Sequence, residues 1–327
     1  MSAEQLYSKY EYIWAQQHNT MDSLFAYIQK YPFIEMDTYG NITVKNCNDN
    51  SLPVFCCHLD TVHEDVPAPE LLGHDVLTSF NGQGIGGDDK CGIVACLELL
   101  EKVKCKCIFF RDEEVGCKGS AEYDAKSLKD DLFCIEIDRR NACDLITKVY
   151  GTKMCSDEFV ARVKDALPHC KVAEGAYTDI SKLGAAEINM LNISSGYYNP
   201  HGSKEYVVLS ELQRNIDGLA VLAKSIIENP MKEKEYKRNE NSGYYQQTDW
   251  WKGKYKRHYS EPPAKEYDLY GNEINGEDDY NALQYGHVPD EPDGFPGDSY
   301  GTQTRNPKDY SDKVIAYYAK KSKKASS

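Results

Sequence analysis

Apolar runs of strand length alternate with helix-like patterns over roughly the first 230 residues of this 327-residue chain. Such alternation predicts a mostly parallel, mixed β-sheet with helices on both faces, which is a three-layer α/β/α domain. The expected strands are 34–46 (a hairpin that turns at 39–41), 53–57, 104–111, 132–137, 144–150 and 187–193, with a further hairpin within 62–82. The expected helices are two within 3–30, then 89–102, 120–128, 158–167, 180–183 and 212–227, the last opened by a capping box of Ser210 and Gln213.

Residues 84–95 read G-I-G-G-D-D-K-C-G-I-V-A and lead directly into the helix expected at 89–102. Glycine lets the backbone pass close to a ligand. The N-terminus of a helix adds unpaired N–H groups beside the two aspartates. An aspartate in this position is either a helix cap or a ligand, and the segment alone leaves both roles open.

Polar clusters follow several of the expected strands, where an α/β sheet binds its ligands. His58-Leu59-Asp60 ends one strand, Glu113-Glu114 follows another, and Asp138 ends a third. His201 lies in the later loop Y-N-P-H-G. Each residue taken singly is explained by a structural role, such as a strand-end histidine, a solvated turn or an ion pair of Asp138 with a following arginine. Their order and placement together favour one shared site.

Two histidines and several carboxylates supply mixed nitrogen and oxygen ligands, which suit zinc, with cobalt or manganese as alternatives. Asp88 has two carboxylate oxygens and is the candidate bridge between two cations. Of the adjacent pair Glu113 and Glu114, one can bind metal while the other stays free as a base. We therefore expect two metal ions that jointly activate a water.

The net charge of −14 disfavours nucleic-acid binding, which requires clustered Lys and Arg. No stretch approaches the roughly 20 apolar residues of a membrane span, and the N-terminus lacks the pattern of a signal peptide. The twelve cysteines all lie between Cys47 and Cys170, many of them inside apolar patterns, so we expect reduced, buried thiols without disulfides. We expect a cytoplasmic protein without a nucleic-acid or membrane partner.

From residue 231 onward the chain is rich in Tyr, Lys, Asp, Asn, Gly and Pro, and poor in Leu, Ile and Val. Such a composition cannot bury enough apolar surface to offset the entropy of ordering the chain. We therefore expect a domain at 1–230 and a low-complexity, Tyr-rich tail at 231–327, largely disordered over 231–312 with a short basic helix at 313–324. The tail either binds a protein partner or is merely solvated.

The motifs H-L-D-T-V, G-G-D-D-K-C-G, D-E-E-V-G-C-K-G-S and P-H-G-S-K-E-Y resemble, in the same order, the metal-binding segments of the co-catalytic dizinc exopeptidases. That group includes peptidase T-like tripeptidases, ArgE/DapE-type deacylases and single-domain zinc aminopeptidases. The resemblance spans roughly residues 5–230. It implies the zinc exopeptidase (phosphorylase/hydrolase-like) fold and two Zn²⁺ ions.

Residue by residue, the resemblance implies His58, Asp88 and Asp138 as ligands of one zinc ion. Asp88, Glu114 and His201 would bind the other zinc ion, so that Asp88 is common to both ions. Glu113 would be the general base, and Asp60 would orient a ligand histidine. Asp89 is the weaker alternative to Asp88 as the shared ligand.

The interval between Asp138 and His201 is too short for the lid domain that many members of this group insert there. We therefore expect a catalytic domain without a lid, in which Thr178, Asp179 and Asn199 line the substrate pocket. The expected activity is hydrolysis of N-terminal peptide bonds in small peptides, as an aminopeptidase or tripeptidase. Deacylation of N-acyl amino acids, and a non-catalytic binding protein with the same fold, are the alternatives.

Overall fold

The computed structural model describes residues 1–16, 21–63, 66–79, 82–231 and 235–238. It also describes a separate antiparallel strand pair, β14 (Glu266–Tyr267) and β15 (Glu273–Ile274). Glu235 forms a bridge with Ile188, and Arg238 donates to the backbone oxygen of Ile180, so contacts with the domain extend to the end of the described segment. The expectations for the rest of the tail lie outside the described residues.

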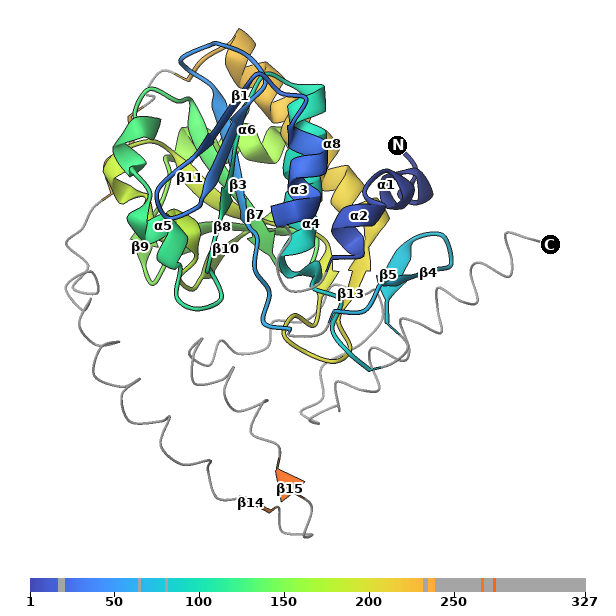
Figure 1. The fold of residues 1–327 in the computed structure, drawn as a ribbon. Coiled ribbons are helices and arrows are strands. Elements are labelled where there is room, and N and C mark those ends of the chain that lie inside the picture. The colour runs from blue at the N-terminus through green and yellow to red at the C-terminus, as the bar shows by residue number, and fades with distance from the viewer. Residues whose placement is uncertain are drawn as a thin grey trace. The chain divides into compact units, whose positions relative to one another are not determined.

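The main sheet has nine strands in the order β1-β2-β6-β3-β7-β11-β8-β10, with β9 paired to β8 (Figure 1). Its centre is parallel, because β3 pairs in parallel with both β6 and β7, and β11 pairs in parallel with β7. The antiparallel pairs lie toward the edges. The strands are β1 (Phe33–Met36), β2 (Ile42–Lys45), β3 (Pro53–His58), β6 (Lys106–Phe110), β7 (Phe133–Arg139), β8 (Asp144–Val149), β9 (Thr152–Lys153), β10 (Lys171–Gly175) and β11 (Met190–Ser194).

Helices cover both faces of this sheet and enclose a hydrophobic core on each side. The larger core packs one face of the sheet against helices α1–α4, α6 and α8. The smaller core packs the opposite face against η1, α7 and η2. The helices are α1 (Ala3–Lys9), α2 (Glu11–Trp14), α3 (Met21–Ile28), α4 (Gly87–Lys102), α5 (Lys118–Glu122), η1 (Ala125–Leu128), α6 (Asp157–Ala166), α7 (Asp179–Lys182), η2 (Gly184–Ala186) and α8 (Leu209–Glu228). The predicted three-layer α/β/α architecture is confirmed.

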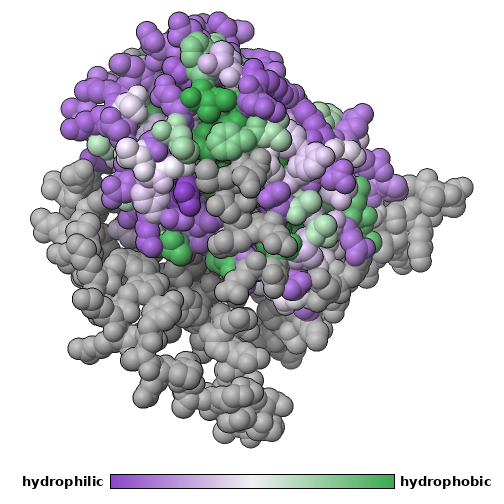
Figure 2. Space-filling view, viewed as in Figure 1, coloured by the Kyte–Doolittle hydropathy of each residue, from purple (hydrophilic) through white to green (hydrophobic). Residues whose placement is uncertain are grey.

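Central and edge strands differ in how completely they are covered. All six residues of β3 are buried, as expected for a strand with helices on both faces. The edge strand β1 has no buried residue. Figure 2 shows hydrophobic surface over β1 and α3, the elements that carry the exposed side chains of Met36 and Phe25.

A second sheet of four strands lies beside the segments predicted to bind metal, in the order β12-β13-β5-β4. It joins the loop that carries His201 to the hairpin that precedes the glycine-rich segment, because β13 pairs with β5. Its strands are β4 (Glu70–Leu72), β5 (Val76–Thr78), β12 (Tyr197–Tyr198) and β13 (Tyr206–Val208). The sequence patterns indicated the β4–β5 hairpin but not β12 or β13.

The predicted capping box at Ser210 is wrong. Helix α8 begins at Leu209, and its N-cap residue makes no side-chain cap bond. Both the backbone N–H and the Oγ of Ser210 donate to the carboxylate of Asp75, at 2.7 and 2.8 Å. A tertiary contact thus satisfies the groups that a local cap would have satisfied.

All twelve cysteines are free of disulfides, and all except Cys47 and Cys143 are buried, which confirms their predicted packing role. In the part of the chain that the structure describes, no helix combines the length and apolar character needed to traverse a bilayer.

Substitution of Phe133 by alanine tests the larger core. Phe133 is 0% exposed, and its ring packs against Phe55 and Phe159 at centroid distances of 5.9 and 5.2 Å. We expect Phe133→Ala to lower the free energy of unfolding by about 3–5 kcal/mol in urea denaturation. Val221→Ala, on the exposed face of α8, should change it by less than about 0.5 kcal/mol. Equal effects of the two substitutions would contradict the described core.

Candidate metal centre

The ends of neighbouring strands bring the predicted polar residues to one edge of the main sheet. His58 is the last residue of β3, and Asp138 is the second-to-last residue of β7, which pairs with β3. Glu113 and Glu114 follow β6, the other neighbour of β3. Because these three strands are parallel, their carboxyl ends meet at the same edge.

The His58 imidazole is buried and contacts carboxylates from three segments. Its Nε2 atom lies 3.1 Å from Asp88 Oδ1 and 3.5 Å from Asp138 Oδ1. Its Nδ1 atom lies 3.0 Å from the backbone oxygen of Asp60 and 3.5 Å from Asp60 Oδ1. Asp60 is therefore placed to fix the ring orientation and tautomer of His58.

The His201 imidazole approaches the same group from the loop between β12 and β13. Its Nε2 atom lies 3.4 Å from Asp88 Oδ2 and 3.2 Å from Glu114 Oε2. Asp88 thus offers one oxygen to each imidazole. The result is a two-centred arrangement, with Asp138 on the His58 side and Glu114 on the His201 side.

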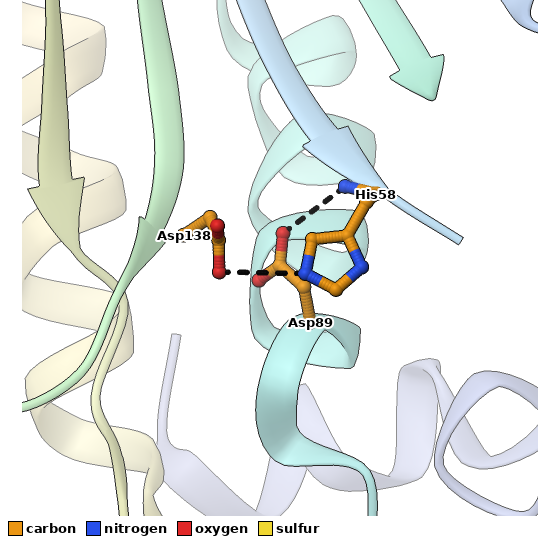
Figure 3. Close-up of side chains that lie close together, drawn as sticks. All are labelled: His58, Asp89 and Asp138. Atoms are coloured by element: carbon orange, nitrogen blue, oxygen red, sulfur yellow. Dashed lines mark hydrogen bonds and ion pairs between the residues drawn. The ribbon is translucent and has the colours of Figure 1, made fainter. Parts of the chain in front are cut away.

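Adjacent residues Asp88 and Asp89 have different surroundings. Asp89 Oδ2 accepts the backbone N–H of His58 at 3.3 Å, and its Oδ1 accepts the N–H of Gly92 at 2.8 Å. Figure 3 shows the Asp89 carboxylate between His58 and Asp138, so it also lies within ligand distance of a cation at that point. A Cβ at Gly92 would come within 2.3 Å of Asp89 Oδ2, which explains the glycine.

Opposite charges shift the pKa values of both imidazoles upward. Burial alone would lower the pKa of His58, but the carboxylates of Asp138, Asp60 and Asp88 raise it well above its ordinary value. Burial likewise opposes the shift at His201, where Asp88 and Glu114 raise the pKa to about 11. Without metal, protons on these two imidazoles therefore supply the positive charge that balances the neighbouring carboxylates.

The residues present fit a metal ion. Glu114 Oε1 is buried and has no hydrogen-bond partner among the described residues. An unpaired buried carboxylate oxygen is costly unless a ligand satisfies it. Two groups offer three ligand atoms within 4.8 Å of one another: His58 with Asp89 and Asp138, and His58 with Asp88 and Glu114. Imidazole nitrogens with carboxylate oxygens are a donor set typical of zinc, cobalt or manganese.

Asp60 also fixes the backbone that carries the two glutamates. Its Oδ1 accepts the N–H of Glu113 at 3.0 Å, and its Oδ2 accepts the N–H of Glu114 at 3.1 Å. The thiol of Cys117 donates to Glu113 Oε1 at 3.4 Å. Burial, together with nearby carboxylates, raises the pKa of Glu113 well above its ordinary value.

The three residues expected to line a substrate pocket lie in different environments. Thr178 Oγ1 donates to Asp138 Oδ2 at 3.3 Å, so it contacts the centre directly. Asp179 is 0% exposed and accepts the hydroxyl of Ser120 at 2.6 Å, which directs it into the protein interior. Asn199 lies in the His201 loop, where its side chain donates to the backbone oxygen of Lys204 at 3.3 Å.

Sequence reasoning did not identify the role of Tyr197. Its hydroxyl donates to Asp138 Oδ1 at 3.1 Å and lies 3.3 Å from the backbone oxygen of Asp138. The tyrosine is buried, and burial with the nearby carboxylates raises its pKa well above the ordinary value. Its proximity in sequence to His201 was the one available signal, and a tyrosine near a histidine is not specific.

No protein-family model matches the chain, and no curated protein matches its sequence. Solved structures do match its fold. Aminopeptidase PepT from Bacillus cereus matches with a TM-score of 0.59 at 11% identity, over 69% of this chain and 99% of that one. A tripeptidase from Staphylococcus aureus gives 0.55 at 14% identity, over 70% and 100%. An aminopeptidase from the archaeon Desulfurococcus kamchatkensis gives 0.50 at 14% identity, over 68% and 94%.

These similarities confirm the predicted fold, which the chain shares with two aminopeptidases and a tripeptidase. Between Asp138 and His201 the chain runs through β8–β12, all of which belong to the two sheets. That interval, which the structure describes throughout, holds no inserted lid domain.

The raised imidazole pKa values predict that zinc binding releases protons. A ligand imidazole must be neutral, whereas both rings are protonated near neutral pH without metal, so the affinity should rise with pH. The expected slope is up to about tenfold per pH unit for each proton released. Calorimetric titration in buffers of different ionisation enthalpy would measure it. His201→Gln should remove one released proton, and His169→Gln, at a half-buried histidine bonded to Asn215, should remove none. Proton release that is unchanged by His201→Gln would contradict this assignment.

The two aspartates can be separated by matched substitutions. Asp88→Asn should abolish tight binding of two metal ions, because an NH₂ group would replace one of the two shared oxygens. Asp89→Asn should retain metal and lower the free energy of unfolding by about 1–3 kcal/mol, since one backbone N–H would lose its acceptor. Metal content by mass spectrometry and urea denaturation would measure both effects. The reverse result would make Asp89 the shared ligand.

Proposed function

We propose that the chain is a dizinc exopeptidase that hydrolyses N-terminal peptide bonds of small peptides, as an aminopeptidase or tripeptidase. The observation that carries this proposal is the position of Asp88 between two imidazoles, with Glu113 beside the centre. A fold shared with aminopeptidases and a tripeptidase supports a peptidase over a deacylase.

In this proposal the ligands of one zinc ion are His58, Asp88 and Asp138. Asp88, Glu114 and His201 hold the other. When bound, two such ions would polarise the scissile carbonyl and lower the pKa of a water molecule.

Glu113 is the proposed general base. Within the described residues, neither imidazole forms an ion pair with its carboxylate, in contrast to Glu114. Burial that raises its pKa makes it a stronger base, suited to take a proton from water and return it to the leaving amine. Asp60 holds the Glu113 backbone N–H, and Cys117 holds one carboxylate oxygen, so the base is fixed at two points.

Glu113→Gln should lower kcat by at least about 10²–10⁴-fold, because the amide cannot accept a proton, while zinc content stays at the wild-type level. Glu122→Gln, at an exposed position of α5, is the matched control and should keep full activity. Wild-type turnover by Glu113→Gln would remove Glu113 from this role.

The substrate class is tested by comparing aminoacyl anilides and a peptide library with N-acetyl amino acids, each with added Zn²⁺ or Co²⁺. Removal of single residues or short units from free N-termini supports the proposal. Hydrolysis of only N-acetyl amino acids would indicate a deacylase. Absence of bound zinc, with no hydrolysis after addition of either metal, would indicate a non-catalytic binding protein.

A further inference from the structure

The carboxylate of Glu205 connects the two segments that carry Asp88 and His201. Glu205 lies four residues after His201, immediately before β13, and is only 1% exposed. Its Oε2 atom accepts the N–H groups of Ile85 and Gly86 at 2.8 and 2.7 Å. Its Oε1 atom accepts the N–H of Asp88 at 3.0 Å.

These three hydrogen bonds require a carboxylate. An ionised carboxylate only accepts hydrogen bonds, and bonds to it are stronger than bonds between neutral groups. A glutamine at this position would turn an NH₂ group toward at least one of the N–H donors. The His63 imidazole lies 3.4 Å from Glu205 Oε2 and adds a further contact from the segment after β3.

The glycine-rich segment lies directly against Glu205. A Cβ at Gly87 would come within 2.7 Å of Val207 Cγ2 and 3.1 Å of Glu205 Oε1, so the backbone reaches this position only with glycine there. The contact therefore fixes the peptide next to Asp88 against the strand that follows the His201 loop.

We infer that Glu205 is a positioning residue of the metal centre, which holds Asp88 and His201 at the separation that lets both contact the same cation. This inference rests on the metal centre of the proposed function. Within the described residues, Glu205 forms no ion pair with the imidazoles of His58 and His201, and it acts through the backbone of Asp88. Removal of its charge should therefore weaken metal binding even in the folded protein. If Glu205 contributed only to stability, the folded variant would bind metal as tightly as wild type.

Glu205→Gln tests the inference with a readout other than activity. We expect the metal-free variant, in the full-length chain, to bind zinc about 10–100-fold more weakly than wild type, as for other residues that orient metal ligands. Competition with a chromophoric zinc indicator measures the affinity, and the visible spectrum of the Co²⁺ form reports the ligand geometry. Glu205→Asp keeps the charge on a shorter side chain and should bind with intermediate affinity.

Asp131→Asn is the matched control, because Asp131 is also 1% exposed and accepts a backbone N–H, that of Leu52, at 3.1 Å. It should lower stability without changing zinc affinity or the Co²⁺ spectrum. If Glu205→Gln folds and has the wild-type zinc affinity and Co²⁺ spectrum, the inference is overturned. If Glu205→Gln does not fold, a wild-type zinc affinity of Glu205→Asp would overturn it. A wild-type chain that binds neither ion would instead overturn the proposed function.

Discussion

Repulsion among buried carboxylates is the constraint on which the rest of the site depends. Asp138 and Glu114 both lie near Asp88, and burial together with the Asp88 charge raises the pKa of each. Ionised groups so close together are stable only when positive charge or hydrogen-bond donors compensate them. His58 and His201 provide part of that compensation, and a divalent cation at each imidazole would provide more.

The acidic side chains around the centre are of two kinds. One kind accepts hydrogen bonds from backbone N–H groups and so fixes the position of neighbouring segments. The other kind faces the imidazoles and keeps oxygens directed into the centre. Asp60, Asp89 and Glu205 are of the first kind, and Asp88, Glu114 and Asp138 are of the second. Asp60, Asp89 and Glu205 thus fix the backbone segments that carry the His58 imidazole and the side chains facing the imidazoles.

The fold and the convergence of the strand-end residues could be predicted because both depend on short-range patterns. Apolar runs identify the parallel strands, and parallel strands bring the residues at their carboxyl ends to one edge of the sheet. Contacts between distant segments could not be predicted in this way. Asp75 takes the donors of Ser210 although 135 residues separate them, and nothing local at either position indicates it. The hydrogen bond from Ser120 to the buried Asp179 likewise joins two helices that lie far apart in the sequence.

The small second sheet has a consequence for the order in which the centre is completed. Residues of β13 pair with those of β5, which precede every predicted ligand except His58. During synthesis, four of the predicted ligands (His58, Asp88, Glu114 and Asp138) leave the ribosome before the His201 loop does. Until then the predicted centre has the His58 imidazole and its carboxylates but lacks the His201 imidazole, whose loop is held to the hairpin by the pairing of β13 with β5.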